Sequence, residues 1–286
     1  MPSERDLRRR VRSVKNIQQL TRAMQLVAAS KMRRAQDSVL ASRPFEQKLR
    51  SVLNELAPYA DPEVSPLLQR RTPIRRVALV LITTDRGLVG PMNVNLLRTA
   101  LRFAQEQPET AYLAVGRKGI GSLRRLRAPV IAEFPNIPDR PSTSDTNVIA
   151  RVAVDEFTGG NVDEVHLGFT RFINTLRQEP TIRRILPLVP EEEDIDDLPP
   201  IQYLFEPDPQ AVMDLILPRF IEMAVYQAVL ESKASQFSAQ MVAMRNATDA
   251  ADDIIGDLTL AANKARQTRI TKEMLEIASG AEAQKG

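Results

Sequence analysis

Apolar side chains recur every three or four residues through the N-terminal segment, which is the spacing of an amphipathic helix. The stripe consists of Leu7, Val11, Val14, Ile17, Leu20, Met24, Val27, Met32, Ala35, Val39, Phe45, Leu49, Val52 and Leu56. Ser3 is a suitable N-cap, and Glu4 and Asp6 follow in the first turn, where carboxylates complement the helix dipole. Pro44 interrupts the stripe and predicts a kink or a local break. We therefore predict a long N-terminal helix over residues 1–57.

Helical periodicity returns at residue 208 and continues to residue 286. Between residues 211 and 277 the only proline is Pro218 and the only glycine is Gly256. The expected inward positions are small, namely Ala228, Ser232, Ser235, Ala239, Ala243, Ala247, Ala250, Ala261 and Ala265. The expected apolar contacts come from Val225, Val242, Ile254, Leu258, Met274 and Ile277. Because neither long helix can bury its stripe alone, we predict that the two helices pair as a two-stranded coiled coil.

The central segment, residues 74–206, has a different pattern. "IRRVALVLITTD" is a continuous β-branched run typical of a buried parallel strand. Further strands are predicted at "TAYLAVG", "PVIAEFP" and "VDEVHLGFTRF", with helices at "PMNVNLLRTALRFAQEQ" and "STSDTNVIARVAVDEF" and a short turn or helix at "KGIGSLRRL". The prolines of "TIRRILPLVP" favour an edge strand. This alternation predicts the α/β class, with an open Rossmann-like sheet between the two terminal helices.

Composition narrows the chemistry that this chain can perform. Cysteine is absent, so thiolate catalysis and thiolate metal sites are excluded, and the one histidine, His166, lies in a strand pattern and is interpreted as structural. The acidic run 191–197 fits no calcium loop. Neither an apolar run of about 18 residues nor a secretory signal is present. We predict no cofactor and no metal.

Positive charge is concentrated near the N-terminus, although the net charge is only +3. Residues 1–34 hold ten arginines and lysines against two acids, Glu4 and Asp6. A solvated helix face explains such a stretch most simply, and binding to nucleic acid is the main alternative. Stacking aromatic residues are absent from the stretch, and membrane-surface anchors such as Trp or Phe are absent before Phe45.

Two local motifs invite an enzymatic interpretation. "GRKGIG" at residues 116–121 could cradle a phosphate, but it matches neither the P-loop nor the dinucleotide-binding pattern. Asp85, at the end of a predicted strand, could be a catalytic acid, but a turn formed with Gly87 explains it better. Met241 and Met244 are interpreted as core residues.

Four blocks carry a family resemblance that spans the chain in order. These are "RSVKNIQQLTRAMQLVAASKMRRAQ", "LITTDRGLVGPMN", "QYLFEPDP" and "MVAMRNATDAADDIIGDLTLAANKARQTRITKEMLEIASGA". They closely resemble the gamma subunit of F-type ATP synthases. The resemblance implies a noncatalytic rotor whose terminal helices form an antiparallel coiled coil inside the hexamer of alpha and beta subunits. It also implies that the central domain lies against the epsilon subunit and the membrane ring of c subunits, and that rotation cycles the catalytic beta sites.

The resemblance also implies which residues contact partners. Met24 matches the methionine near the acidic loop of beta. Arg266 and Gln267 match the "A-R-Q" that meets the catch loop of the catalytic subunits, and Thr271 and Glu273 lie just beyond. The residues implied near the c ring and epsilon are Tyr203, Phe205 and Glu206.

A shaft that turns inside a collar is expected to be stiff and to have a hydrophilic outer face without a wide apolar patch. The basic residues expected to suit acidic loops on beta are Arg9, Arg12, Lys15, Arg22, Lys31 and Arg33. Exposed ion pairs of this kind contribute only about 0–1 kcal/mol each, so several could hold a register and still release it.

Two positions depart from the family pattern. Gln240 stands where the family often has arginine, which puts the catch contact shared with that arginine in doubt. Val89 replaces a usual cysteine, which indicates a packing role at that position. The paired-cysteine insertion of chloroplast gamma subunits is absent, which favours a bacterial source and leaves a mature mitochondrial form as the alternative. For a bacterial source, the resemblance implies a peripheral location on the cytoplasmic side of the cell membrane.

Two alternatives come from other functional classes. The first is a basic coiled-coil protein that binds DNA or RNA, and the second is an enzyme that binds nucleotide in the central domain. Co-purification with nucleic acid, rather than with three copies each of two nucleotide-binding partners, would support the first. Calorimetric nucleotide binding by the isolated chain would support the second.

Overall fold

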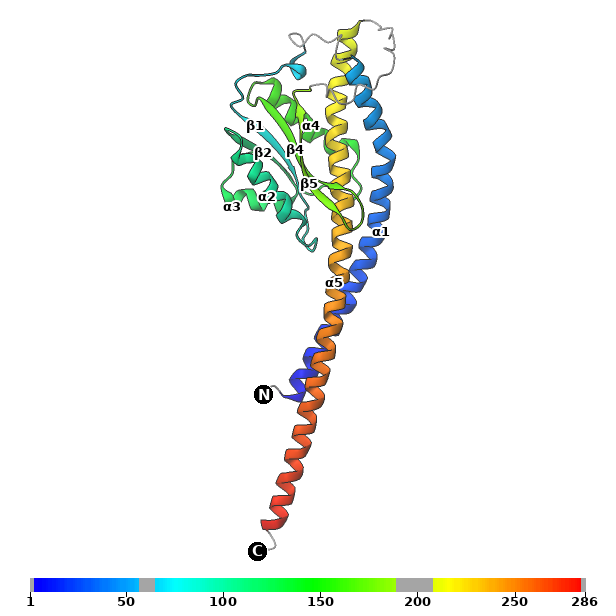
Figure 1. Cartoon of the computed structure of the whole chain (residues 1–286), viewed down its shortest axis with the longest axis vertical. Helices are drawn as coiled ribbons and strands as arrows, with labels where there is room; N and C mark the ends of the chain where they lie inside the picture. Colours follow the sequence, from blue (N-terminus) through cyan, green and yellow to red (C-terminus); the bar gives the residue numbers. More distant parts are fainter. Residues whose placement is uncertain (1–2, 57–64, 189–207, 284–286) are drawn as a thin grey trace. The chain divides into compact units, whose positions relative to one another are not determined.

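A computed structural model describes residues 3–56, 65–188 and 208–283 of the chain (Figure 1). The chain separates into two compact units. The helical unit comprises Met1–Ala28 and Met241–Gly286, and the sheet unit comprises Ala29–Gln240. Two long helices, α1 (Glu4–Leu56) and α5 (Pro209–Ala283), contribute residues to both units.

The predicted N-terminal helix is confirmed, but the local break predicted at Pro44 is wrong. Helix α1 continues through Pro44 from Glu4 to Leu56. The proline lacks the N–H that would bond to the carbonyl of Leu40. Because both Leu40 and Pro44 are exposed, water can satisfy that carbonyl and the helix need not end.

The sheet unit contains a five-stranded sheet in the order β3-β2-β1-β4-β5. Its strands are β1 (Val77–Ile82), β2 (Thr110–Val115), β3 (Val130–Phe134), β4 (Glu164–Phe172) and β5 (Gln178–Leu186). The shorter helices are α2 (Met92–Gln105), α3 (Arg117–Leu126) and α4 (Thr143–Thr158), and a 3₁₀ turn, η2, spans Pro66–Leu68. Strands β1 to β4 are parallel, whereas β5 pairs antiparallel with β4 at the edge of the sheet. The Rossmann-like sheet and its edge strand are therefore confirmed.

Side chains of β1 alternate between two apolar cores on opposite faces of the sheet. Leu79 and Leu81 pack with the buried residues of α2 and α3. Ala78, Val80 and Ile82 point to the other face, which α4 and the first half of α5 cover (Figure 1). Full burial of one leucine stabilises a fold by about 1.5–3 kcal/mol, so both layers contribute strongly to folding.

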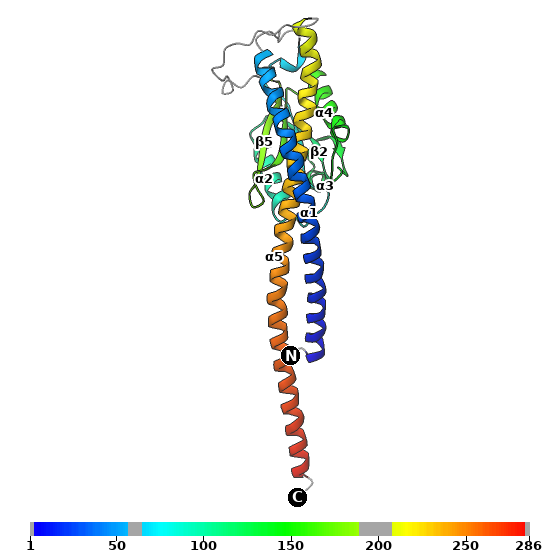
Figure 2. The same cartoon turned by 90° about the vertical axis from the view of Figure 1, so that its right-hand side faces the viewer.

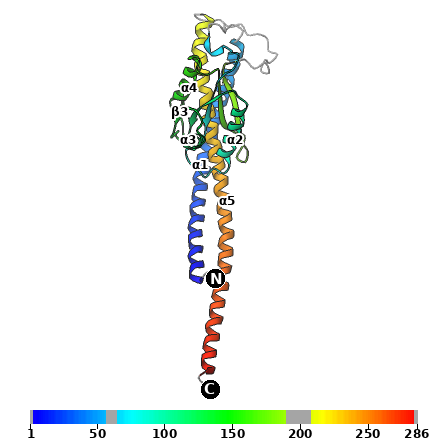
Figure 3. The same ribbon diagram turned by 90° about the vertical axis from the view of Figure 1, so that its left-hand side faces the viewer.

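In the helical unit, α1 and α5 run side by side in opposite directions (Figures 2 and 3). Glu4 lies beside Arg269, Gln18 beside Asp252 and Thr21 beside Thr248, so positions that rise along α1 meet positions that fall along α5. In the sheet unit α1 and α5 also run in opposite directions (Figures 2 and 3), and Ser42 bonds to Gln227 there. The antiparallel pairing is therefore confirmed within each unit.

Helices in the described part of the chain do not combine the length and the apolar character required to cross a bilayer.

Candidate functional site

The helical unit is held together by a seam of mostly small and polar residues. On α1 the buried or half-buried seam positions are Leu7, Val11, Val14, Gln18, Thr21, Gln25 and Ala28. On α5 they are Met244, Thr248, Ala251, Ile255, Leu258, Ala262 and Ala265. Both sets alternate spacings of three and four, which is the heptad repeat of a coiled coil.

Polar contacts cross this seam at three levels. The hydroxyls of Thr21 and Thr248 share a buried hydrogen bond of 2.8 Å. The amide of Gln18 donates to the carboxylate of Asp252. Nearer the start of α1, Arg269 lies 3.3 Å from the carboxylate of Glu4. Small side chains allow close approach of the two helices, and these pairs fix which positions face one another.

The predicted apolar stripe of α1 is only partly correct. Leu7, Val11 and Val14 face the seam as predicted, but Ile17 and Leu20 face outward. Val27 also faces outward, and the adjacent Gln18, Thr21 and Ala28 occupy the seam instead. A count of apolar residues cannot find this seam, because polar and small residues allow the helix backbones to pack more closely than isoleucine would.

The small-residue face predicted on α5 is only partly correct in the helical unit. Ala243, Ala247 and Ala265 are half-buried, in agreement with the prediction. Ala250 and Ala261 are exposed, and the adjacent Ala251 and Ala262 are buried instead. The apolar contacts predicted for Ile254, Met274 and Ile277 are also wrong, because these side chains are exposed.

Several large apolar side chains lie on the outer surface of the helical unit among its charged residues, so the expected hydrophilic outer face is only partly correct. On α1 they are Ile17, Leu20, Leu26 and Val27, each 53% to 67% exposed. On α5 they include Leu260, Met274, Leu275 and Ile277, each 62% to 72% exposed. Exposed apolar side chains that gather on one part of a protein surface are typical of sites of interaction with another molecule.

The final turns of α5 have no partner helix within the helical unit. Arg269 is level with Glu4, the first residue of α1, and α5 continues to Ala283. Figure 2 shows these turns beyond the N-terminus. All residues from 271 to 280 are exposed, so the apolar side chains there have no cover from the described chain.

The structure places five of the predicted contact residues in the helical unit. Met24 is half-buried on α1, and the other four are exposed on α5. Arg266 and Glu273, seven residues apart, lie on one face of the helix. Gln267 and Thr271, four residues apart, lie on another. Glu273 accepts a hydrogen bond of 2.9 Å from Arg269 and so is held within the chain.

The remaining predicted contact residues, Tyr203, Phe205 and Glu206, lie outside the described residues. Gln240, where the resemblance leads us to expect arginine, is half-buried on α5.

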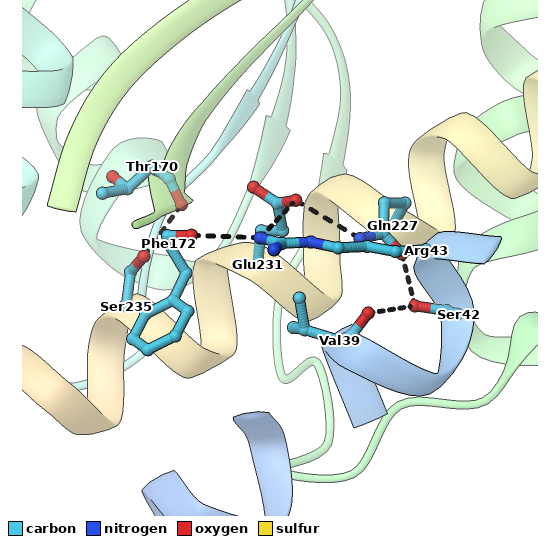
Figure 4. Close-up of polar contacts among 8 residues, drawn as sticks. All are labelled: Val39, Ser42, Arg43, Thr170, Phe172, Gln227, Glu231 and Ser235. Atoms are coloured by element: carbon cyan, nitrogen blue, oxygen red, sulfur yellow. Dashed lines mark hydrogen bonds and ion pairs between the residues drawn. The ribbon is translucent and has the colours of Figure 1, made fainter. Parts of the chain in front are cut away.

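A second polar site lies in the sheet unit, where α1, α5 and β4 meet (Figure 4). The guanidinium of Arg43 donates to the carbonyl of Phe172 at 3.2 Å and lies 3.7 Å from the carboxylate of Glu231. That carboxylate also accepts from Gln227 at 3.3 Å. Ser42 donates to Gln227 at 2.5 Å, so adjacent residues of α1 reach adjacent turns of α5.

Sequence reasoning missed this site. Arg43 and Glu231 are remote in the chain, and neither belongs to a motif with known chemistry. One signal was present, because Glu231 and Lys233 are charged residues within the small-residue run that was predicted to face inward. Both are buried in the structure. Charges in such a run indicate specific partners, since an unpaired buried charge is costly.

The glycine motif at residues 116–121 is filled by a side chain of the protein itself. A Cβ at Gly116 would lie 2.2 Å from the carbonyl oxygen of Thr83, and one at Gly119 would lie 2.7 Å from the Thr83 hydroxyl oxygen. That hydroxyl accepts a hydrogen bond of 2.8 Å from the N–H of Gly119. The glycines therefore serve close packing of α3 on β1.

Asp85 has a structural role, but its hydrogen bonds go to residues other than Gly87, with which a turn was predicted. Its carboxylate accepts hydrogen bonds from the backbone N–H groups of Arg117, at 3.1 Å, and Asn136, at 2.9 Å. It thus joins the end of β1 to the start of α3 and to the loop after β3.

Helix α5 covers the edge of the sheet where doubly wound folds bind ligands. Beside the end of β1, Ser232, Lys233 and Gln236 leave a cavity of about 10 Å³, which is room for about one water molecule. The ammonium group of Lys233 donates to the carbonyl of Ile137 at 2.9 Å. Burial lowers the pKa of Lys233, and the nearby carboxylates of Asp85 and Asp139 act in the opposite direction.

His166 is packed between strand and helix, which agrees with its structural interpretation. Its Nε2 lies 2.8 Å from the carboxylate of Glu164, and its ring lies 4.8 Å from the ring of Phe103. Burial lowers the pKa of His166, although Glu164 favours the protonated form. Among the described residues, no group of three or more His, Cys, Asp or Glu side chains could hold a metal ion.

Two residues singled out for packing are buried. Val89 and Met244 lie in the interior, and Met241 is half-buried.

Comparison with known proteins agrees with this arrangement. The ATP synthase family model, "ATP-synt", matches residues 3–284. The ATP synthase gamma chain of Dehalococcoides mccartyi is 46% identical over 289 residues, covering 99% of each chain. That of Roseiflexus castenholzii is 47% identical over 288 residues, again covering 99% of each chain.

Solved structures share the fold at lower identity. A chain of the Euglena gracilis mitochondrial ATP synthase, from a structure of OSCP, F1 and the c ring, aligns with a TM-score of 0.71 at 20% identity, covering 98% of this chain and 94% of that chain. A chain of the Tetrahymena thermophila enzyme, from its central stalk and c ring, aligns with a TM-score of 0.61 at 24% identity, covering 80% and 99%.

Proposed function

Since the chain belongs to the ATP synthase gamma-chain family and is its noncatalytic rotor subunit, we propose that the helical unit is the part that contacts the catalytic hexamer of alpha and beta subunits. The rotor couples ion-driven rotation of the c ring to conformational cycling of the catalytic beta subunits. In this proposal the helical unit turns within the hexamer and changes the contacts that each beta subunit makes.

The observation that carries this proposal is the outward-facing apolar surface of the helical unit. A two-helix pair in water gains most stability by turning its large apolar residues inward. Here α1 and α5 place several large apolar residues outward, although small and polar residues occupy more than half of the seam positions. This distribution suits a helical pair that is surrounded by other subunits.

Individual contacts follow from the family pattern. We assign Met24 to the neighbourhood of the acidic loop of beta. Arg266 and Gln267 are assigned to the catch loop of the catalytic subunits, with Thr271 and Glu273 beyond them. The four α5 side chains are exposed and can therefore reach a partner.

Contacts with the membrane side are assigned to Tyr203, Phe205 and Glu206, which would meet the c ring and the epsilon subunit. The chain would then lie on the cytoplasmic side of a bacterial membrane, peripherally and through the c ring.

Substitution of Arg266 tests the proposal. Arg266→Ala, and separately Gln267→Ala, should impair coupled ATP turnover of the assembled complex, because each removes an exposed donor assigned to the catch loop. The helicity of the isolated chain should not change, since alanine is a strong helix former. Circular dichroism and ATP-driven ion transport by the assembled complex are the measurements.

Lys264→Ala is the matched control. Lys264 is also an exposed cation on α5, but it lies two residues from Arg266 and hence on the opposite face of the helix. Full coupled turnover of the Arg266→Ala and Gln267→Ala complexes would refute the catch-loop assignment. If Lys264→Ala impaired coupled turnover equally, positive charge anywhere on this part of α5 would be required, and not the face that carries Arg266.

A further inference from the structure

Three elements that are distant in sequence converge on the Arg43 side chain. Arg43 is on α1, its hydrogen-bond acceptor Phe172 ends β4, and its ionic partner Glu231 is on α5. Ser235, one turn further along α5, donates to the carbonyl of Thr170 at 3.0 Å. The end of β4 is thus tied to α5 directly and to α1 through one guanidinium group (Figure 4).

Glu231 depends on this arrangement for its counter-charge. Its side chain is 10% exposed, and Arg43 is its ionic partner. Within the described residues, its second carboxylate oxygen is buried and has no hydrogen-bond partner. A buried carboxylate with one unpaired oxygen is costly unless a cation lies beside it, so the arrangement of helices that brings Arg43 to Glu231 is strongly favoured.

The apolar contacts around this site do not define a register by themselves. Ala35 and Val39 of α1 pack with Leu230, Ala234 and Phe237 of α5. Apolar contacts are non-directional, so a core of this kind can repack in more than one way provided that its volume is conserved. Polar pairs at single seam positions, in contrast, are a well-attested means of fixing helix register.

We propose that Arg43 and Glu231 are a positioning pair that locks α1, α5 and β4 in one register, so that torque carried by the two helices reaches the sheet unit without slip. This inference rests on the proposed function, because a register lock affects activity only if the helices transmit rotation. Arg43 and Glu231 act by holding the elements that must turn together.

The test uses the full chain assembled with its cognate catalytic and membrane subunits in sealed vesicles. Arg43→Gln removes the charge and retains most of the side-chain volume. We expect the complex to hydrolyse ATP but to transport fewer ions for each ATP hydrolysed. The isolated chain should melt roughly 5 °C or more below the wild type, because Glu231 loses its partner.

Two further variants separate positioning from stability. The double variant Arg43→Gln/Glu231→Gln removes the unpaired buried charge, so its melting temperature should recover toward that of the wild type. Its ion transport per ATP should remain low, because the register lock is still absent. Arg43→Lys keeps a cation beside Glu231 and should restore part of the transport.

Arg124→Gln is the matched control. Arg124 donates to Glu133 at 2.8 Å and links α3 to β3, so Arg124→Gln removes an Arg–Glu pair of the same unit that does not contact α1 or α5. This variant should transport ions at the wild-type ratio. A reduced ratio in the Arg124→Gln complex would overturn the assignment of the positioning role to Arg43 and Glu231.

The remaining outcomes distinguish the two proposals. A wild-type ratio of ions to ATP in the Arg43→Gln complex, measured below its melting temperature, would overturn the positioning role and leave the proposed function intact. If Arg43→Gln does not fold, the ratio of ions transported to ATP hydrolysed in the double variant tests the positioning role instead. Failure of the wild-type chain to restore transport would instead count against the proposed function.

Discussion

The two units of this molecule are stabilised in different ways. The sheet unit buries large apolar residues on both faces of its sheet, with Leu79, Leu113 and Ile221 at 0% exposure. The helical unit closes its seam with a mixture of small, polar and larger apolar residues and leaves other large apolar residues, such as Leu20, in water. The sheet unit therefore supplies its own core, whereas the apolar surface of the helical unit is available to partners.

Helix α1 shows both characters along a single element. Val39, in the sheet unit, is fully buried, and Leu20, in the helical unit, is 60% exposed. Intrinsic helix preference cannot explain the difference, because both stretches are helical. Burial by neighbouring elements decides where an apolar residue of this helix contributes to the fold and where it can serve binding.

The largest effect on stability should come from the core of the sheet unit. Leu79→Ala should lower the free energy of unfolding by about 2–5 kcal/mol, because it leaves a cavity between β1 and the helices that cover it. Leu20→Ala makes the same chemical change at an exposed position and should cost less than about 0.5 kcal/mol. Urea denaturation of the isolated chain, followed by circular dichroism, measures both.

If the outer face of the helical unit binds partners, the substitution at Leu20 should matter in the assembled complex even though it hardly affects the isolated chain. Leu20→Ala should then weaken assembly with the catalytic subunits although the isolated chain is unaffected. Equal stability losses for the two variants in the isolated chain would contradict the distinction between the units.

A smaller effect is expected from a charge placed in the helical seam. Ala251→Glu should destabilise the helical unit by about 1–3 kcal/mol, because a buried group without a hydrogen-bond partner loses its hydration. The cost is limited because the two helices can separate locally. Ala250→Glu, at the exposed neighbouring position, is the control and should be nearly neutral. Thermal melting by circular dichroism distinguishes them, and equal melting temperatures would contradict the seam derived from burial.

Local patterns were sufficient to predict the elements of the fold. The β-branched run before Thr83 predicted β1, and the prolines after Arg184 predicted the edge position of β5. The long helix over residues 1–57 was predicted, but the sequence could not decide whether Pro44 would break it, because that depends on an exposed carbonyl that water can reach. The packing of α5 on the sheet was also missed, since it is set by contacts between elements that are not adjacent in the sequence.

The candidate sites also divide into residues that the sequence could identify and residues that only the structure brings together. Arg266 and Gln267 could be found because a family motif includes them. The seam was predicted one residue out of phase at Ala250, because spacings of three and four fit two adjacent helix faces when small residues occupy both. Arg43 and Glu231 could not be paired from sequence, because nothing local links them.

The smallest expected effect concerns pH and only the sheet unit, since the one histidine of the chain is His166. Burial lowers the pKa of His166 below its ordinary value of 6.5, with Glu164 and Arg184 as the charged neighbours. A histidine with a lowered pKa in the folded state binds fewer protons than it does in the unfolded chain. Stability linked to it is therefore complete above the unfolded pKa and falls as the pH drops from there toward the folded pKa.

His166→Gln should consequently flatten the pH dependence of stability below about pH 6.5, the ordinary histidine value. The measurement is the difference between wild-type and variant urea midpoints at several pH values from neutral to mildly acidic. That difference subtracts the titration of carboxylates, which both chains share. Ala250→Glu is the control. It adds a carboxylate to the helical unit but leaves His166 in place, so the stability of the sheet unit should depend on pH as in the wild type. An unchanged slope in the His166→Gln chain would show that burial does not suppress protonation of this histidine.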